Sequence, residues 1–188
     1  PNSQCTLRAA VQETNALSGA DTIILPAGIY TLTIPGVGEN LAATGDLDLN
    51  DDLTLTGAGA AATIIDGGAL DRVLHLNTSG RTVQVSGVTL RHGDGSLSGA
   101  GGAIMLQANT RLVLSDSVVS DSISPAGGGI FALSTSHLTI NRSALERNIT
   151  NASNGGGISA SGMVTITAST IMSNTASGAS GAGLDLGS

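Results

Sequence analysis

Carboxylates grouped in one short stretch are the side chains most able to do chemistry in this chain. The group consists of Asp46, Asp48, Asp51 and Asp52, with Asn50 between them. Carboxylates at this spacing could bind Ca²⁺ or take part in acid–base catalysis. Asp46 and Asp48 alternate with leucines, which predicts that both lie on the solvent face of a strand. The sequence therefore predicts a solvated strand and turn or, as the alternative, a calcium site formed by these four aspartates.

Asp71 and Arg72 are a second candidate pair, because an arginine beside a carboxylate can act as the base of a β-helix polysaccharide lyase. The favoured interpretation is an ion pair at an exposed turn, which contributes only about 0–1 kcal/mol. The three histidines, His75, His92 and His137, lie far apart in the sequence. We expect them at the surface, without a shared metal ion.

The composition predicts many short strands joined by tight turns. Hydrophobic residues make up 40% of the 188 residues, but Tyr30 and Phe131 are the only aromatic ones. Aliphatic side chains must therefore form the core, and the 27 glycines favour turns. The net charge is −7, and all seven basic residues are arginine. An acidic chain without a basic cluster is not expected to bind nucleic acid, and no apolar run is long enough to insert into a membrane.

A repeat of about 26 residues is the main signal in the second half of the chain. Gly-Gly-Ala-Ile at 101–104 returns as Gly-Gly-Gly-Ile at 127–130 and 155–158, and a weaker copy ends at Leu184. Leu112, Leu138 and Val164 recur at a spacing of 26, each within a short alternation of apolar and polar residues that is typical of a strand. We expect these three side chains to lie directly above one another in the core.

Two polar columns follow the same spacing. Ser117, Ser143 and Ser169 are expected to form an interior stack in which each hydroxyl bonds a neighbour. Asn148 and Asn174 follow Ser122 at the same interval, and we expect their amides to bond from coil to coil at a turn.

These patterns predict an all-β chain folded as a right-handed parallel β-helix, or β-solenoid. One coil cannot bury its own apolar side chains, whereas coils stacked about 4.8 Å apart bury them in continuous columns. We expect residues 20–188 to form roughly six coils that continue in a longer chain. Residues 1–19 are expected to form an N-terminal cap segment with a short helix over 6–16, which begins at Thr6 and covers the apolar end of the first coil.

The N-terminal half also resembles a known family. Cys5-Thr-Leu-Arg-Ala-Ala-Val11 is similar to the CSLREA motif of bacterial secreted β-helix proteins, although Ala9 stands where that motif has Glu. The similarity continues through residues 20–30, 45–49, 53–59, 64–67 and 70–73. The later coils are similar to the GGA(I/L/V) and FxxN repeats of polymorphic outer membrane proteins. The resemblance implies a secreted or cell-surface location in bacteria, and it implies that Cys5 is one half of a disulfide whose partner lies upstream.

The function expected from these observations is a non-catalytic extracellular scaffold or adhesin module, and assembly into a larger surface structure or filament is a variant of the same expectation. Its partners would be other domains of the same chain or a second copy at the open end of the β-helix, and no cofactor other than Ca²⁺ is expected. A polysaccharide lyase or hydrolase is one alternative. A calcium-dependent or ice-binding module is the other, because outward threonines form a partial array at Thr54, Thr56, Thr139, Thr165 and Thr167.

Overall fold

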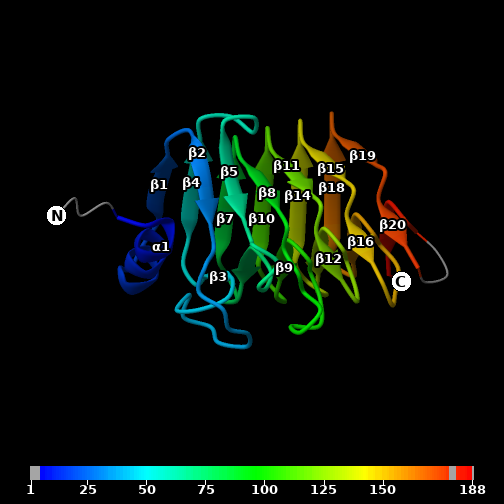
Figure 1. Cartoon of the computed structure of the whole chain (residues 1–188), viewed down its shortest axis with the longest axis horizontal. Helices are drawn as coiled ribbons and strands as arrows, with labels where there is room; N and C mark the ends of the chain where they lie inside the picture. Colours follow the sequence, from blue (N-terminus) through cyan, green and yellow to red (C-terminus); the bar gives the residue numbers. More distant parts are fainter. Residues whose placement is uncertain (1–4, 178–180, 188) are drawn as a thin grey trace.

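The chain forms a solenoid of parallel strands with a short helix near its N-terminus (Figure 1). The structure, a computed structural model, describes residues 5–177 and 181–187. It confirms the predicted all-β parallel β-helix and its N-terminal helix. Residues 1–4 of the expected cap segment, and residues 178–180 and 188 of the expected β-helix, lie outside the described residues.

Three long sheets run along the axis of the solenoid, and each has six parallel strands in its described part. Sheet A contains β1 (Asp21–Leu25), β4 (Leu53–Gly57), β7 (Thr82–Ser86), β10 (Arg111–Ser115), β14 (His137–Asn141) and β18 (Met163–Thr167). Sheet B contains β2 (Gly28–Thr31), β5 (Thr63–Asp66), β8 (Thr89–Arg91), β11 (Val118–Ser120), β15 (Ala144–Glu146) and β19 (Thr170–Met172). Sheet C contains β3 (Leu47–Leu49), β6 (Leu74–Leu76), β9 (Ile104–Leu106), β13 (Ile130–Ala132), β17 (Ile158–Ala160) and β21 (Leu184–Leu186).

The later coils carry a short fourth strand that the sequence repeat did not predict. Sheet D contains β12 (Ile123–Ser124), β16 (Ile149–Thr150) and β20 (Thr175–Ala176). These strands lie between sheets B and C along the chain. They are two residues long, too short to show an alternation of apolar and polar side chains.

Aliphatic side chains stack between coils as the repeat predicted. Leu112 pairs in register with Val83 on one side and Leu138 on the other, and Leu138 pairs with Val164. Leu112 and Leu138 are buried, and Val164 packs partly buried against the same core. Burying one such side chain stabilises a fold by about 1.5–3 kcal/mol. The stack of aliphatic columns is therefore the main source of the solenoid's stability.

Serine and asparagine ladders link the coils at the turns, which confirms both predicted polar columns. The Ser143 hydroxyl accepts a hydrogen bond from the Ser117 amide at 3.1 Å, and the Ser169 hydroxyl accepts one from the Ser143 amide at 3.1 Å. In the other ladder, Asn148 Oδ1 accepts from the Ser122 amide at 3.2 Å, and Asn174 Oδ1 accepts from the Asn148 amide at 2.9 Å. The Asn148 amide group also donates to the Val119 carbonyl at 3.0 Å. Side chains thus satisfy buried backbone groups where the strands end.

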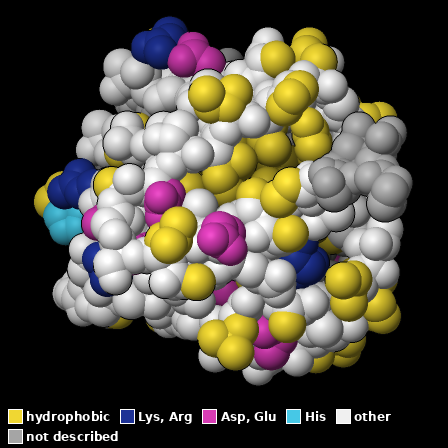
Figure 2. Space-filling model, turned by 90° about the vertical axis from the view of Figure 1, so that its left-hand side faces the viewer, with side chains coloured by type: hydrophobic (Ala, Val, Ile, Leu, Met, Phe, Trp, Pro, Cys, Tyr) yellow, Lys and Arg dark blue, Asp and Glu magenta, His cyan; other side chains and the backbone are white. Residues whose placement is uncertain are grey.

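Helix α1 (Leu7–Ala16) lies against β1 and β3 at the N-terminal end of the stack. As expected, Thr6 is its N-cap and accepts a hydrogen bond from the Ala9 amide at 3.1 Å. Leu7 and Val11 face the core. Arg8 is also buried, which the apolar pattern did not predict. The cap is partial, because hydrophobic side chains remain visible at this end of the molecule (Figure 2).

Candidate functional site

A buried polar cluster lies on the outer face of sheet C, where β3 and β6 run side by side. Leu47, Leu49, Leu74 and Leu76 point into the core, so Asp48 and His75 must point to the other face. Asp48 is 0% exposed and His75 is 4% exposed, while Asp46 just before β3 is also buried. The predicted solvent face for Asp46 and Asp48 is therefore wrong, and so is the predicted surface position of His75.

The cover over this cluster comes from residues 33–46, which lie between β2 and β3 and which we call the strap. Arg8 of α1 holds its end by donating to the carbonyls of Ala42 at 3.0 Å, Gly45 at 2.5 Å and Asp46 at 2.9 Å. The Ala42 amide in turn donates to Asp48 Oδ2 at 2.9 Å. The strap and α1 together exclude water from side chains that a strand pattern alone would expose.

Asp48, His75 and Gln107 form a chain of hydrogen bonds across three coils. His75 Nδ1 lies 3.0 Å from Asp48 Oδ1, and His75 Nε2 lies 3.1 Å from the Gln107 amide nitrogen. An ionised carboxylate accepts and an amide nitrogen donates, so this arrangement corresponds to a neutral imidazole with its proton on Nδ1. The orientation of the Gln107 amide and the tautomer of His75 are therefore coupled.

Asp46 pairs with Arg72, whose Nε lies 2.7 Å from Asp46 Oδ2. Burial nevertheless raises the pKa of Asp46 to about 6; the Arg72 charge opposes the rise, and the charges of Asp48 and Asp71 add to it. Desolvation also lowers the pKa of the Arg8 guanidinium, against the charges of Glu39, Asp46 and Asp48. The cluster thus holds more negative charge than its two arginines neutralise.

Asp71 and Arg72 do not form the exposed turn ion pair that the sequence favoured, and that prediction is wrong. Both are buried, and the Arg72 side chain turns away to Asp46. Asp71 Oδ1 accepts hydrogen bonds from the Arg72 amide at 2.8 Å and from the Ser98 hydroxyl. Its second oxygen, Oδ2, is buried without a hydrogen-bond partner and faces the backbone of Gly45.

The four aspartates of the predicted calcium site are not gathered in one place. Asp46 and Asp48 meet His75 instead, with possible ligand atoms that all lie within 4.8 Å of one another. Asp51 and Asp52 turn to Arg81, at 3.0 Å and 3.6 Å. The sequence could have suggested His75 only through the register of the coils, because it stands 27 residues after Asp48.

The other two histidines lie elsewhere. His92 is exposed at the turn after β8 and lies 3.1 Å from Asp66, and His137 begins β14 on sheet A. Asp66 also accepts from Arg91 of the next coil at 2.8 Å. Burial raises the pKa of Asp66, but hydrogen bonds from Arg91, the Gly68 amide and His92 outweigh it and hold that pKa below its usual range.

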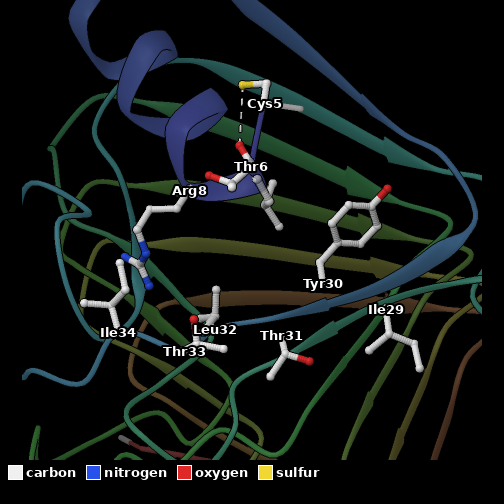
Figure 3. A pocket seen from close by; sticks show the side chains of 10 residues that line it. Cys5, Thr6, Arg8, Ile29, Tyr30, Thr31, Leu32, Thr33 and Ile34 are labelled. Atoms are coloured by element: carbon white, nitrogen blue, oxygen red, sulfur yellow. Dashed lines mark hydrogen bonds between the residues drawn. The ribbon is translucent and has the colours of Figure 1, made fainter. Parts of the chain in front are cut away.

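A groove at the N-terminal end is the other hollow of note, lying between the start of α1 and the free edge of β2 (Figure 3). Cys5 and Tyr30 lie at its rim, with Ile29 and Ile34 along the same strand and its extension. Cys5 is an exposed free thiol, so the disulfide implied by the resemblance remains a prediction.

Three comparisons with known proteins found no matching family model, no matching curated protein and no matching solved structure. In the described residues, no helix is both long and apolar enough to cross a membrane.

Proposed function

We propose that this chain is a non-catalytic scaffold module of an extracellular or cell-surface protein. The observation that carries the proposal is that polar side chains link neighbouring coils to one another. The serine and asparagine ladders, and the charged pairs Asp116–Arg142 and Asp121–Arg147, join one coil to the next at a spacing of 26 residues. Such links favour a rigid rod over a site that binds and releases a substrate.

The burial of the Asp–His–Arg cluster argues against a polysaccharide lyase or hydrolase. A raised pKa at Asp46 and an Asp48–His75 pair resemble the groups of a general acid–base catalyst. A catalytic group must touch its substrate, yet Asp48 is 0% exposed and the strap lies over it. A polymer of sugar units cannot reach these atoms unless the strap leaves.

The proposed location and partners rest on two further points. The resemblance of the first coils to secreted CSLREA-motif proteins favours the outside of a bacterial cell. The last described strands, β18, β19 and β21, each pair on one side only. An unpaired strand edge can accept another strand, so we propose further coils of a longer chain, or a second copy, as its partner.

Activity on a panel of uronate and neutral polysaccharides tests the non-catalytic role. We expect no release of reducing ends and no unsaturated product from the purified chain. Product formed by the wild type and abolished in both Asp71→Asn and His75→Gln would overturn the proposal in favour of a β-helix lyase or hydrolase.

Sedimentation and electron microscopy over a concentration series test self-association at the open edge. We expect assemblies that grow with concentration and are disrupted by Met172→Lys, since this exposed residue lies on β19 and a lysine blocks edge pairing. Leu97→Lys is the matched control, because it adds the same charge at an exposed loop position. Monomers at every concentration would exclude the second copy as partner.

A further inference from the structure

The buried cluster has a charge imbalance that its own residues do not correct. Three buried carboxylates act on it, those of Asp46, Asp48 and Asp71, whereas its cations are Arg8 and Arg72. His75 is neutral in the hydrogen-bond arrangement described above. Burying uncompensated charge is costly, and buried carboxylates are normally paired or bound to a metal.

Three side chains of this cluster bring together donor atoms of the kind that bind a metal ion. Asp46, Asp48 and His75 offer two carboxylate oxygens and one imidazole nitrogen, all within 4.8 Å of one another. Imidazole combined with carboxylate suits Zn²⁺, whereas Ca²⁺ takes six to eight oxygen ligands. All three side chains are at least nine-tenths buried, so the site lies in a protected, low-dielectric place.

Each of these three side chains also forms a hydrogen bond with a second group, which fixes its orientation. Arg72 bonds Asp46, the Ala42 amide bonds Asp48, and Gln107 bonds the far nitrogen of His75. Supporting hydrogen bonds of this kind fix metal ligands in place, and their loss typically weakens binding about 10–100-fold.

An independent observation comes from Asp71. Its Oδ2 atom is buried without a hydrogen-bond partner, in a residue that is 1% exposed. The atom faces Gly45, next to Asp46, and the Asp71 charge acts directly on Asp46. A buried oxygen without a donor requires a compensating group, such as an ion or a water molecule.

We propose that Asp46, Asp48 and His75 bind a divalent transition-metal cation of the Zn²⁺ type, which fastens the strap and the first two coils together. The cation replaces the proton that joins His75 Nδ1 to Asp48, and the ring loses this proton from Nδ1 while it takes one up from solvent at Nε2, so the imidazole stays neutral and no net proton is released. His75 Nε2 then carries the ring proton and donates to the Gln107 amide oxygen, which requires that amide to turn over. The site has a structural role, because its ligands are enclosed.

Calorimetry and thermal melting with Zn²⁺ alone test this site. The chain is stripped of metal with EDTA, and Zn²⁺ is added either to the folded protein or during refolding, in case the strap slows entry. We expect one Zn²⁺ per chain, a melting temperature that rises with Zn²⁺ and a weaker response to Ca²⁺. His75→Gln should abolish the response, while His137→Gln, a histidine change on sheet A, should leave it unchanged.

Nitrogen-15 spectra of the histidine rings in the wild type identify the ligand without any variant. The chain has three histidines, so the signals can be assigned. A Zn²⁺-dependent shift of His75 Nδ1 supports the site even if His75→Gln fails to fold. No shift at His75, a shift confined to His92 or His137, or a response to Ca²⁺ but not to Zn²⁺ would overturn the proposal.

Discussion

The first coils and the later coils of this solenoid are stabilised in different ways. Around β3 and β6 the outer face of sheet C carries charged side chains that a helix and a strap keep from solvent. From β10 onward the strands of sheets A, B and D recur every 26 residues, and charges stay on the outside, as in Asp116–Arg142. The comparison shows that a regular repeat needs only stacking and turn ladders, whereas the irregular end depends on contacts between distant segments.

Shortening a side chain in the regular stack has the largest expected effect. Leu112→Ala removes a buried column member between Val83 and Leu138 and leaves a cavity. We expect the free energy of unfolding to fall by about 2–5 kcal/mol, measured by urea denaturation. Val164→Ala, in the same column but only partly buried, should cost about 1 kcal/mol or less. Equal losses at the two positions would contradict the stacking account.

Breaking the asparagine ladder comes next. Asn148→Ala leaves the Ser122 amide and the Val119 carbonyl without their buried partner. We expect a loss of about 3 kcal/mol, seen as a lower urea midpoint. Asn141→Ala changes the same residue type on the half-exposed outer face of sheet A and should alter stability by less than about 0.5 kcal/mol. A similar small change at both positions would show that the ladder is dispensable.

A smaller effect on the free energy of unfolding is expected when low pH protonates Asp66, in the early coils. Because the pKa of Asp66 is held low by its partners in the folded state, this carboxylate stabilises the fold above its unfolded pKa, near 4. That contribution is lost as the pH falls through the folded value. Asp66→Asn should therefore lower the urea midpoint at pH 7 and flatten its dependence on pH below about 5. Parallel pH profiles for wild type and variant would count against it.

The smallest effect is expected at the outer charged turns of the later coils. Arg142→Ala removes the pair with Asp116, both of which are well exposed, and exposed pairs contribute little. Arg142 also has a left-handed backbone, with φ of 47°, a conformation that glycine adopts without strain. Arg142→Gly should therefore be at least as stable as Arg142→Ala in thermal melting. The reverse order would mean that the side chain, rather than the backbone, governs this turn.

The later coils could be predicted from sequence because each repeats the surroundings of its neighbour. A residue such as Leu138 meets Leu112 and Val164 at a fixed interval, so one spacing determines many contacts. The helix start at Thr6 was equally local. The short strands of sheet D and the charge pairs at left-handed turns gave too brief a pattern to be predicted.

The cluster could not be predicted because its burial is not local. Asp48 alternates with leucines as a solvent-facing residue does, and its strand pattern is the same whether or not something covers it. The cover is the strap, and Arg8 holds it in place by donating to carbonyls 34 to 38 residues away. Asp46 and Arg72 likewise pair across coils, although Asp71 is the neighbour of Arg72 in sequence.

The amino-acid sequence by itself determined the stacked-coil architecture, the aliphatic columns and the serine and asparagine ladders, because these depend on a repeated interval between like residues. Only the tertiary structure decided that Asp46, Asp48 and His75 meet in one enclosed place and that Asp51 and Asp52 do not join them. The physical reason is that solvent exclusion depends on what α1 and the strap cover, a property that no single strand encodes.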